Sequence, residues 1–160
     1  MAESEPDIEG RIVARLTARG EFVATAESCS GGLIAHRLTN VPGASACFVG
    51  GVVAYSNEVK CAVLGVSRET LAAHGAVSEA TAREMAIGAR ERFAADYALA
   101  VTGIAGPTGG APEKPVGLVY AALATAEDVV VRRHDFEGDR DAVKRQTADA
   151  ALELLWEALA

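Results

Sequence analysis

The chain has 160 residues, half of them hydrophobic, which is enough for a single domain with a sizeable core. Its formal net charge of −7 argues against a nucleic-acid partner, which usually meets a basic face, but a few local donors can still hold a small anionic ligand. No apolar run reaches the ~20 residues of a membrane-spanning helix, and the acidic N-terminus predicts no signal peptide.

The first elements follow from hydrophobic spacing. Residues 1–7 are expected to be frayed, and a helix is predicted over 8–18, ended by Gly20. A short strand is expected at 22–26, followed by a second helix that Ser30 or a neighbour caps.

The apolar segment 47–56 predicts a buried strand, and its internal glycines indicate the close approach of another backbone. The remaining predicted elements are, in order, helices at 57–65, 67–74 and 79–93, a strand at 96–103, a glycine- and proline-rich loop at 104–117, strands at 118–125 and 128–136, and a last helix after Gly138 and Asp139.

Strands and helices therefore alternate, which is typical of a layered α/β domain with a partly parallel sheet, and the hairpin at 118–136 makes the expected sheet mixed. Ligands of such sheets bind beyond the carboxyl ends of the strands. Three polar or glycine-rich segments fall there, at 27–32, 55–60 and 102–110. Their convergence predicts the site.

The first of these segments reads Glu-Ser-Cys-Ser-Gly-Gly. Ser28 and Ser30 carry hydroxyls that could act as a nucleophile, and Gly31 and Gly32 could turn backbone N–H groups toward a phosphate at a helix N-terminus. The alternative interpretation is an ordinary capped helix start.

The second segment contains Tyr55 and Lys60. A serine needs a base to become a nucleophile, and a lysine whose pKa is lowered by burial can serve. Tyr55 could orient that base or stack on a ring, and Glu27 could pair with Lys60 or position water. A solvated lysine is the alternative, and the three histidines are expected to be surface or structural residues: His36, His74 and His134.

In the third segment, Gly103 and Gly106 permit close backbone approach, and Thr102 supplies a hydroxyl at a strand end. Such groups can form an oxyanion hole or a phosphate nest, although the segment matches neither the P-loop nor the dinucleotide-binding fingerprint. A glycine-rich crossover turn is the alternative.

Arg140, Lys144 and Arg145 lie in the first turns of the last helix, where cations oppose the helix dipole, so a bound anion would explain them. Surface arginines are the alternative. No metal is expected, because no paired histidine, cysteine or carboxylate motif is present. Three cysteines without disulfide spacing favour a reduced, cytoplasmic location: Cys29, Cys47 and Cys61.

Six blocks in this order resemble the CinA C-terminal domain family, in particular its stand-alone PncC-type nicotinamide-nucleotide amidases: TAESCSGG, GGVVAYSNEVKCAVLGV, VSEATAREMAIGAR, AVTGIAGPTGG, KPVGLVYAAL and GDRDAVKRQT. The resemblance covers about residues 8–159. It implies a three-layer α/β/α sandwich and hydrolysis of nicotinamide mononucleotide (NMN) to nicotinate mononucleotide and ammonia, in pyridine nucleotide salvage, without metal or other cofactor.

The resemblance also implies the site. The family serine falls on Ser28, the lysine on Lys60 with Tyr55 beside it, and the threonine on Thr102. The late arginine region falls on 140–145, and Ser30 stands where the family usually has threonine.

The hypothesis is that Ser28 attacks the carboxamide while neutral Lys60 takes its proton. Ser30 is the alternative nucleophile, and the side chain of Cys29 is expected to point away from that of Ser28. A non-catalytic nucleotide-binding module and an amidase for another small amide are the alternative functions. Exposed apolar residues on alanine-rich helices favour a homo-oligomer.

Overall fold

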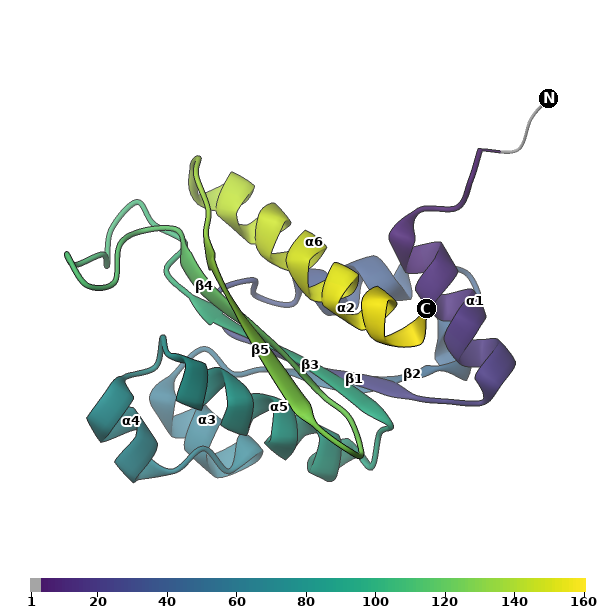
Figure 1. Ribbon diagram of the computed structural model, residues 1–160, viewed down its shortest axis with the longest axis horizontal. Helices are drawn as coiled ribbons and strands as arrows, with labels where there is room; N and C mark the ends of the chain where they lie inside the picture. The colour runs from purple at the N-terminus through teal and green to yellow at the C-terminus, as the bar shows by residue number, and fades with distance from the viewer. Residues whose placement is uncertain (1–3) are drawn as a thin grey trace.

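The computed structural model describes residues 4–160 as a five-stranded sheet between two layers of helices (Figure 1). The elements are α1 (Ile8–Arg19), β1 (Val23–Glu27), α2 (Leu33–Thr39), a 3-10 turn (Ala44–Ala46), β2 (Phe48–Val53), α3 (Asn57–Leu64), α4 (Arg68–His74), α5 (Glu79–Phe93), β3 (Tyr97–Gly103), β4 (Leu118–Ala124), β5 (Val129–Asp135) and α6 (Arg140–Leu159).

The strands lie in the order β2-β1-β3-β4-β5. β1 pairs in parallel with β2 and β3, whereas β3-β4 and β4-β5 are antiparallel, so the sheet is mixed. Figure 1 shows α1, α2 and α6 on one face and α3, α4 and α5 on the other. The predicted three-layer sandwich with a partly parallel sheet is confirmed.

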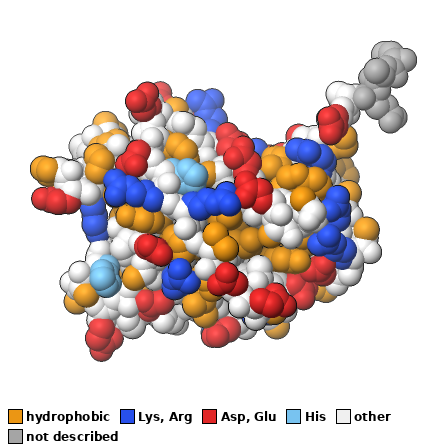
Figure 2. Space-filling view, in the orientation of Figure 1, with side chains coloured by type: hydrophobic (Ala, Val, Ile, Leu, Met, Phe, Trp, Pro, Cys, Tyr) orange, Lys and Arg blue, Asp and Glu red, His pale blue; other side chains and the backbone are white. Residues whose placement is uncertain are grey.

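The core has one part on each face of the sheet, because side chains alternate along a strand. In β3, Leu99 and Val101 pack with α1, α2 and α6, while Ala98 and Ala100 face α5. The small alanines let α5 approach the sheet closely. Figure 2 shows acidic and basic side chains interspersed over one face of the molecule, with no large patch of one sign.

Predicted helix ends are largely confirmed. Gly20 and Gly65 end α1 and α3 in the left-handed conformation, and Ser67 and Ser78 cap α4 and α5. Ser56 caps α3 by accepting a hydrogen bond from the Val59 N–H, which fixes the start of the helix that carries the lysine of the site.

Three expectations are wrong. α2 begins only at Leu33, after Gly32, and Ser30 is not its cap. β2 is an edge strand with alternating half-buried and exposed residues, not a buried one, because β1 covers it on one edge only. The glycines of β2 are approached most closely by side chains and not by another backbone, since a Cβ on Gly51 would lie 2.2 Å from the Thr25 hydroxyl oxygen and 3.2 Å from the Thr25 carbonyl oxygen.

The expected frayed segment 1–7 falls partly on residues 1–3, which lie outside the described residues. Residues 4–6 are exposed and have no regular structure, and Asp7 caps α1 by accepting a hydrogen bond from the Gly10 N–H. Between residues 4 and 160, every helix is too short or too polar to span a bilayer.

Candidate active site

A cavity of about 330 Å³ opens at the carboxyl ends of β1, β2 and β3. β1 leads into α2 on one face of the sheet, whereas its neighbour β2 leads into α3 on the other face. Where two neighbouring strands connect to opposite faces, a crevice forms at their carboxyl ends. The cavity is lined by Ser28, Cys29, Tyr55, Asn57, Lys60, Ala76, Val77, Thr102, Gly103, Ile104, Ala105, Gly106, Thr108, Gly109 and Arg140.

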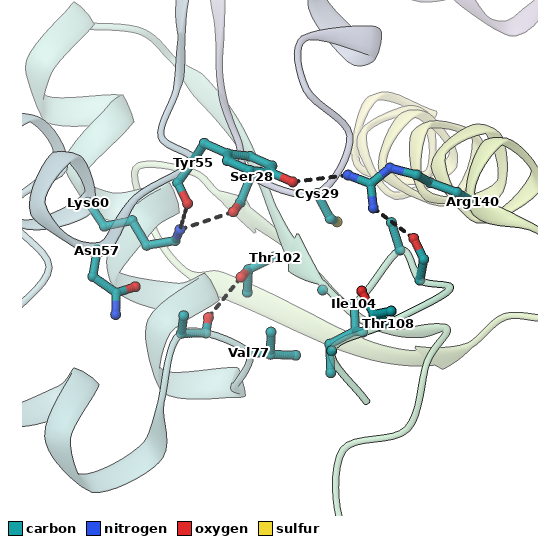
Figure 3. A pocket seen from close by; sticks show the side chains of 15 residues that line it. Ser28, Cys29, Tyr55, Asn57, Lys60, Val77, Thr102, Ile104, Thr108 and Arg140 are labelled. Atoms are coloured by element: carbon teal, nitrogen blue, oxygen red, sulfur yellow. Dashed lines mark hydrogen bonds between the residues drawn. The ribbon is translucent and has the colours of Figure 1, made fainter. Parts of the chain in front are cut away.

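Ser28 and Lys60 meet at one side of this cavity (Figure 3). Lys60 Nζ lies 3.0 Å from Ser28 Oγ. Both residues are buried, and Lys60 is only 1% exposed. Ser28 follows the last residue of β1, and Lys60 projects from the first turns of α3. The alternative of a solvated lysine is excluded.

The environment of Lys60 favours a neutral amine. Burial lowers the pKa of Lys60, and only a weaker effect of Cys29 opposes it. Nζ also donates to the carbonyl oxygens of Ala54, at 2.8 Å, and Tyr55, at 3.3 Å. Among residues 4–160 no carboxylate lies within ion-pair distance of Lys60, so no ion pair offsets the burial of its charge.

Glu27 lies on the opposite side of the strand end and does not pair with Lys60. Its carboxylate accepts hydrogen bonds from the Ser30 hydroxyl and from the N–H groups of Ile34 and Ala35. The N-terminus of α2 is therefore already occupied by a protein carboxylate, and its N–H groups are not free to hold a phosphate.

Arg140 spans the other end of the cavity (Figure 3). Its guanidinium donates to the Gly106 carbonyl at 2.7 Å and to the Tyr55 hydroxyl at 3.0 Å. No carboxylate of residues 4–160 pairs with it. The Tyr55 ring is 64% exposed. An unneutralised guanidinium beside a phenol and a glycine loop can bind an anion.

Thr102 fixes the wall between the two ends. Its hydroxyl donates to the Ala76 carbonyl at 2.7 Å, which ties the end of β3 to the loop between α4 and α5. Val77 in that loop lines the cavity. The oxygen of Thr102 keeps its acceptor capacity toward the cavity.

The register of β3 leaves one backbone donor free. Ile104 N donates to Leu118 O, so the antiparallel ladder uses every second residue of β3 and passes over Gly103. On the β1 side the last ladder bond runs from Ser28 N to Val101 O. Within the described chain, the Gly103 N–H therefore has no partner, and Gly103 lines the cavity beside Ser28.

Other predicted site residues lie elsewhere. Ser30, Gly31 and Gly32 line a separate cavity with Lys144, on the α2 side. Arg145 is exposed and pairs with Asp141 at 3.4 Å. None of the three histidines lines the Ser28 cavity, in agreement with the expectation for them.

The sequence analysis did not single out Asn57, Val77, Ile104 and Gly109, all of which line the cavity. Asn57 stands inside the Tyr55–Lys60 block, three residues before the lysine, and helical spacing places it on the same side of α3. No sequence motif indicated that Val77 lines the cavity, because its loop between α4 and α5 has no side chain with evident catalytic or binding chemistry.

Cys29 also lines the cavity but is a poor nucleophile. Burial raises the pKa of its thiol to about 11, and only 5% of the residue is exposed. The nearby thiol therefore stays protonated at neutral pH. No group of three or more His, Cys, Asp or Glu side chains placed to bind a metal occurs in residues 4–160.

The buried Ser28–Lys60 pair lies at the strand ends of a three-layer α/β/α sandwich, where ligands of such sheets bind. Residues 5–159 match the family model of the CinA C-terminal domain. The chain belongs to the CinA C-terminal domain family.

Relatives cover nearly the whole chain. It is 52% identical to the nicotinamide-nucleotide amidohydrolase PncC of Escherichia coli K12, over 98% of this chain and 96% of that protein. It is 54% identical to a CinA-like protein of Anaeromyxobacter sp. Fw109-5, over 96% of this chain but only 37% of that protein.

Solved structures agree. The competence/damage inducible protein CihA from Agrobacterium tumefaciens has a TM-score of 0.92 and 46% identity, with 99% of both chains covered. A CinA superfamily protein from Klebsiella pneumoniae 700603 has a TM-score of 0.92 and 40% identity, with 96% of both chains covered.

Proposed function

We propose that this protein hydrolyses NMN to nicotinate mononucleotide and ammonia, with Ser28 as nucleophile and Lys60 as general base. The expectation of an enzyme is confirmed by the near-full-length identity to curated amidohydrolases. The observation that carries the Ser–Lys mechanism is the 3.0 Å contact between Lys60 Nζ and Ser28 Oγ in a buried site without a carboxylate partner among the described residues.

The three oxygen atoms around Lys60 Nζ can accommodate the neutral amine that the proposed base requires. Such an amine has two N–H donors and one lone pair. The carbonyls of Ala54 and Tyr55 take the two donors, so the lone pair is left for the Ser28 hydroxyl proton.

Ser28 Oγ then bonds to the carboxamide carbon while its proton moves to Lys60 Nζ. The tetrahedral intermediate breaks its C–N bond, and Lys60 returns the proton to the leaving nitrogen, which departs as ammonia. Water attacks the Ser28 ester with Lys60 again taking a proton, which gives the carboxylate product and restores the Ser28 hydroxyl.

The Gly103 N–H is the donor we assign to the developing oxyanion. It has no partner among residues 4–160, lines the same cavity as Ser28, and belongs to a strand in the rigid sheet. Thr102 holds the adjacent wall through Ala76 and can accept a hydrogen bond from the leaving group or the attacking water.

Arg140 and Tyr55 are the groups we assign to the 5′-phosphate, with Gly106, Thr108 and Gly109 beside them. The phosphate would replace the phenol and carbonyl as partners of the guanidinium, which gains charge neutralisation. The pyridinium charge of NMN further disfavours a proton on Lys60.

A role in pyridine nucleotide salvage, in a reduced cytoplasmic compartment and without cofactor, follows from this reaction and from three free cysteines. A homo-oligomer remains part of the proposal because apolar side chains such as Val49 and Val53 on β2 are about half exposed. The non-catalytic binding module requires a solvated Lys60, whereas Lys60 is 1% exposed.

The test is ammonia release from NMN by the purified protein, in a coupled assay, with nicotinamide riboside and free nicotinamide as parallel substrates. We expect turnover of NMN and weak turnover of both phosphate-free compounds. Binding of NMN without ammonia release would overturn the hydrolytic function and leave the binding module.

A further inference from the structure

Glu27 is a buried carboxylate that the proposed reaction does not use. It is 1% exposed, and no cation of residues 4–160 lies within ion-pair distance of it. Instead it accepts three hydrogen bonds, from Ser30 Oγ at 2.5 Å, Ile34 N at 2.8 Å and Ala35 N at 3.0 Å. A buried carboxylate with three donors and no counter-charge is costly to build, so its position in the fold needs a reason.

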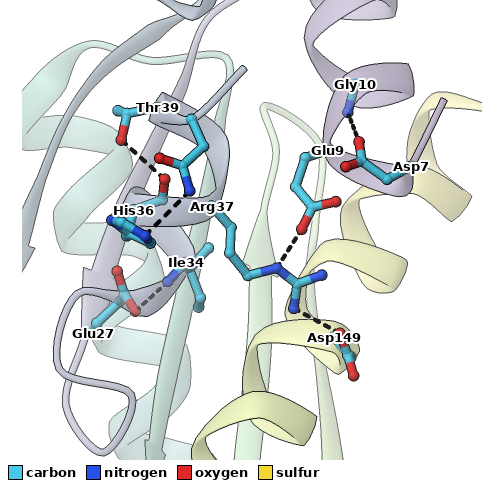
Figure 4. Close-up of polar contacts among 10 residues, drawn as sticks. Asp7, Glu9, Gly10, Glu27, Ile34, His36, Arg37, Thr39 and Asp149 are labelled. Carbon is cyan, nitrogen blue, oxygen red and sulfur yellow. Dashed lines mark hydrogen bonds and ion pairs between the residues drawn. The ribbon is translucent and has the colours of Figure 1, made fainter.

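The donors that Glu27 binds lie within the turn that begins at Ser28 and in the helix that follows it. Ser30 lies within this turn, and Ile34 and Ala35 are in the first turn of α2, whose own cap residue Gly32 has no side chain to bind them. Figure 4 shows the Glu27 carboxylate reaching the Ile34 N–H. A single side chain at the end of β1 therefore holds both the turn and the helix that follows it.

Besides the Glu27 contacts, the turn is held by backbone hydrogen bonds, one of them from Leu33 N to Ser30 O at 3.2 Å. Gly31 and Gly32 have φ angles of 61° and 100°, which only glycine adopts readily, and the turn closes with a 3.1 Å hydrogen bond from Gly31 N to Ser28 O. Two consecutive glycines allow many backbone paths, so the carboxylate selects the path that the chain takes.

The same strand end also connects to the base. The Glu27 carbonyl accepts a hydrogen bond from Ala54 N at 2.8 Å, and the Ala54 carbonyl accepts one from Lys60 Nζ at 2.8 Å. The main chain of Glu27 thus locates Lys60, while its side chain locates the turn that begins with Ser28. Adjacent side chains of the strand end project to opposite faces, so the carboxylate does this without touching the reacting atoms.

We propose that Glu27 is a positioning residue for the nucleophile: it locks the Ser28–Gly32 turn so that Ser28 Oγ stays at Lys60 Nζ. The proposal rests on the proposed function in one respect, namely that Ser28 is the nucleophile.

The experiment uses Glu27→Gln, which keeps the size of the side chain but puts an NH₂ group against backbone donors. Ser30→Ala is the milder second variant, because it removes one of the three donors and leaves both N–H contacts. Glu9→Gln is the matched control. Glu9 is a buried carboxylate, only 7% exposed. It pairs with Arg37 of α2 and does not reach the turn (Figure 4).

Four quantities are measured on protein verified as folded by circular dichroism, well below the melting temperature. They are the rate at which a fluorophosphonate labels Ser28, kcat and KM for NMN, and the Kd of nicotinate mononucleotide by calorimetry. The labelling rate reports Ser28 activation even if NMN is not the substrate, so failure of the proposed function and failure of this inference are distinguishable.

We expect Glu27→Gln to lower both the labelling rate and kcat by roughly 10²-fold, the effect of about 1 Å of misplacement, with KM and the product Kd within about threefold. Ser30→Ala should lower the labelling rate by about three- to tenfold, and Glu9→Gln should lose stability with a labelling rate within about twofold of wild type. If Glu27→Gln does not fold, the labelling rate of Ser30→Ala tests the proposal in its place.

The inference is overturned if folded Glu27→Gln labels at the wild-type rate, or if Glu9→Gln loses labelling to the same extent. It is equally overturned if Ser30→Ala has no effect when it is the deciding variant. A merely structural role would lower the melting temperature of all three variants without changing the rate per folded molecule.

Discussion

Lys60 reaches Ser28 from 32 positions further along the chain and is the largest fully buried side chain among residues 4–160. Burying a lysine side chain among apolar residues and beside a hydroxyl costs much folding free energy if its amine is charged, and much less if its amine is neutral. In the proposed mechanism, the relationship between these two residues sets both the chemistry and its dependence on pH.

The lowered pKa of Lys60 fixes the sign of the pH profile. Below that pKa Lys60 is protonated and cannot accept the Ser28 proton, so kcat/KM should rise with pH and level off once Lys60 is neutral. The midpoint should lie below the ordinary lysine value of about 10.4. A pH–rate profile between pH 5 and 10 checks this, and a midpoint near 10 would contradict the role of Lys60.

The same shift has a thermodynamic consequence. Unfolded Lys60 keeps its proton to a higher pH than folded Lys60, so the unfolding free energy should rise with pH between the two pKa values. In Lys60→Met this contribution is absent. Urea unfolding of both proteins across this pH range measures their unfolding free energies. The difference, wild type minus variant, should rise with pH, and a difference that does not change with pH would argue that Lys60 is charged in the folded state.

Alanine substitutions separate the two serines. Ser28→Ala should lose at least about 10⁴-fold in kcat, because the nucleophile is gone. Ser30→Ala should keep its activity within about tenfold, since Ser30 faces Glu27 and not the cavity. Ammonia release measures both, and an active Ser28→Ala enzyme would end the assignment.

Arg140 and Arg145 form a matched pair for the phosphate. Arg140→Met should raise KM for NMN by roughly 10- to 100-fold, the loss of a charge-assisted contact, with little effect on nicotinamide riboside. Arg145→Met should leave both unchanged because Arg145 is on the surface with Asp141. Equal effects of the Arg140 variant on both substrates would remove its phosphate role.

Gly88 permits α3 and α5 to pack closely, since a Cβ there would lie 1.7 Å from the Leu64 carbonyl oxygen. Gly88→Ala should therefore push α3 outward, destabilise the fold by about 1–3 kcal/mol and move Lys60 with its helix. Gly10→Ala is the control, because its Cβ would meet only the side chains of Asp7 and Pro6, at 3.1 and 3.3 Å. Chemical denaturation and kcat measured together would show whether activity falls beyond the unfolded fraction.

The sequence predicts the meeting of Ser28 and Lys60 because both follow parallel strands whose carboxyl ends share one edge. It does not predict that β2 is at the edge of the sheet, since strand order depends on contacts across the whole chain. The β-branched segment around Gly50 and Gly51 therefore reads as buried although every second residue is exposed.

The contacts of Glu27 depend on the backbone path of the turn after β1, which no local sequence pattern defines. Alternation along β1 already places Glu27 and Ser28 on opposite faces, but the donors that meet Glu27 follow from the φ angles of Gly31 and Gly32. In contrast, Arg145 could have been separated from Arg140 by helical geometry alone, since five residues turn a helix by about 140° beyond one full revolution.

Arg140 stands at the start of α6, more than 100 residues after Ser28. During synthesis, the serine and lysine can come together as soon as β1, β2 and α3 have left the ribosome, but the anion-binding end of the cavity is missing until translation has passed residue 140 and α6 has docked. Under the proposed mechanism, a nascent chain that already carries its nucleophile would not bind a nucleotide until the last layer of the sandwich is in place.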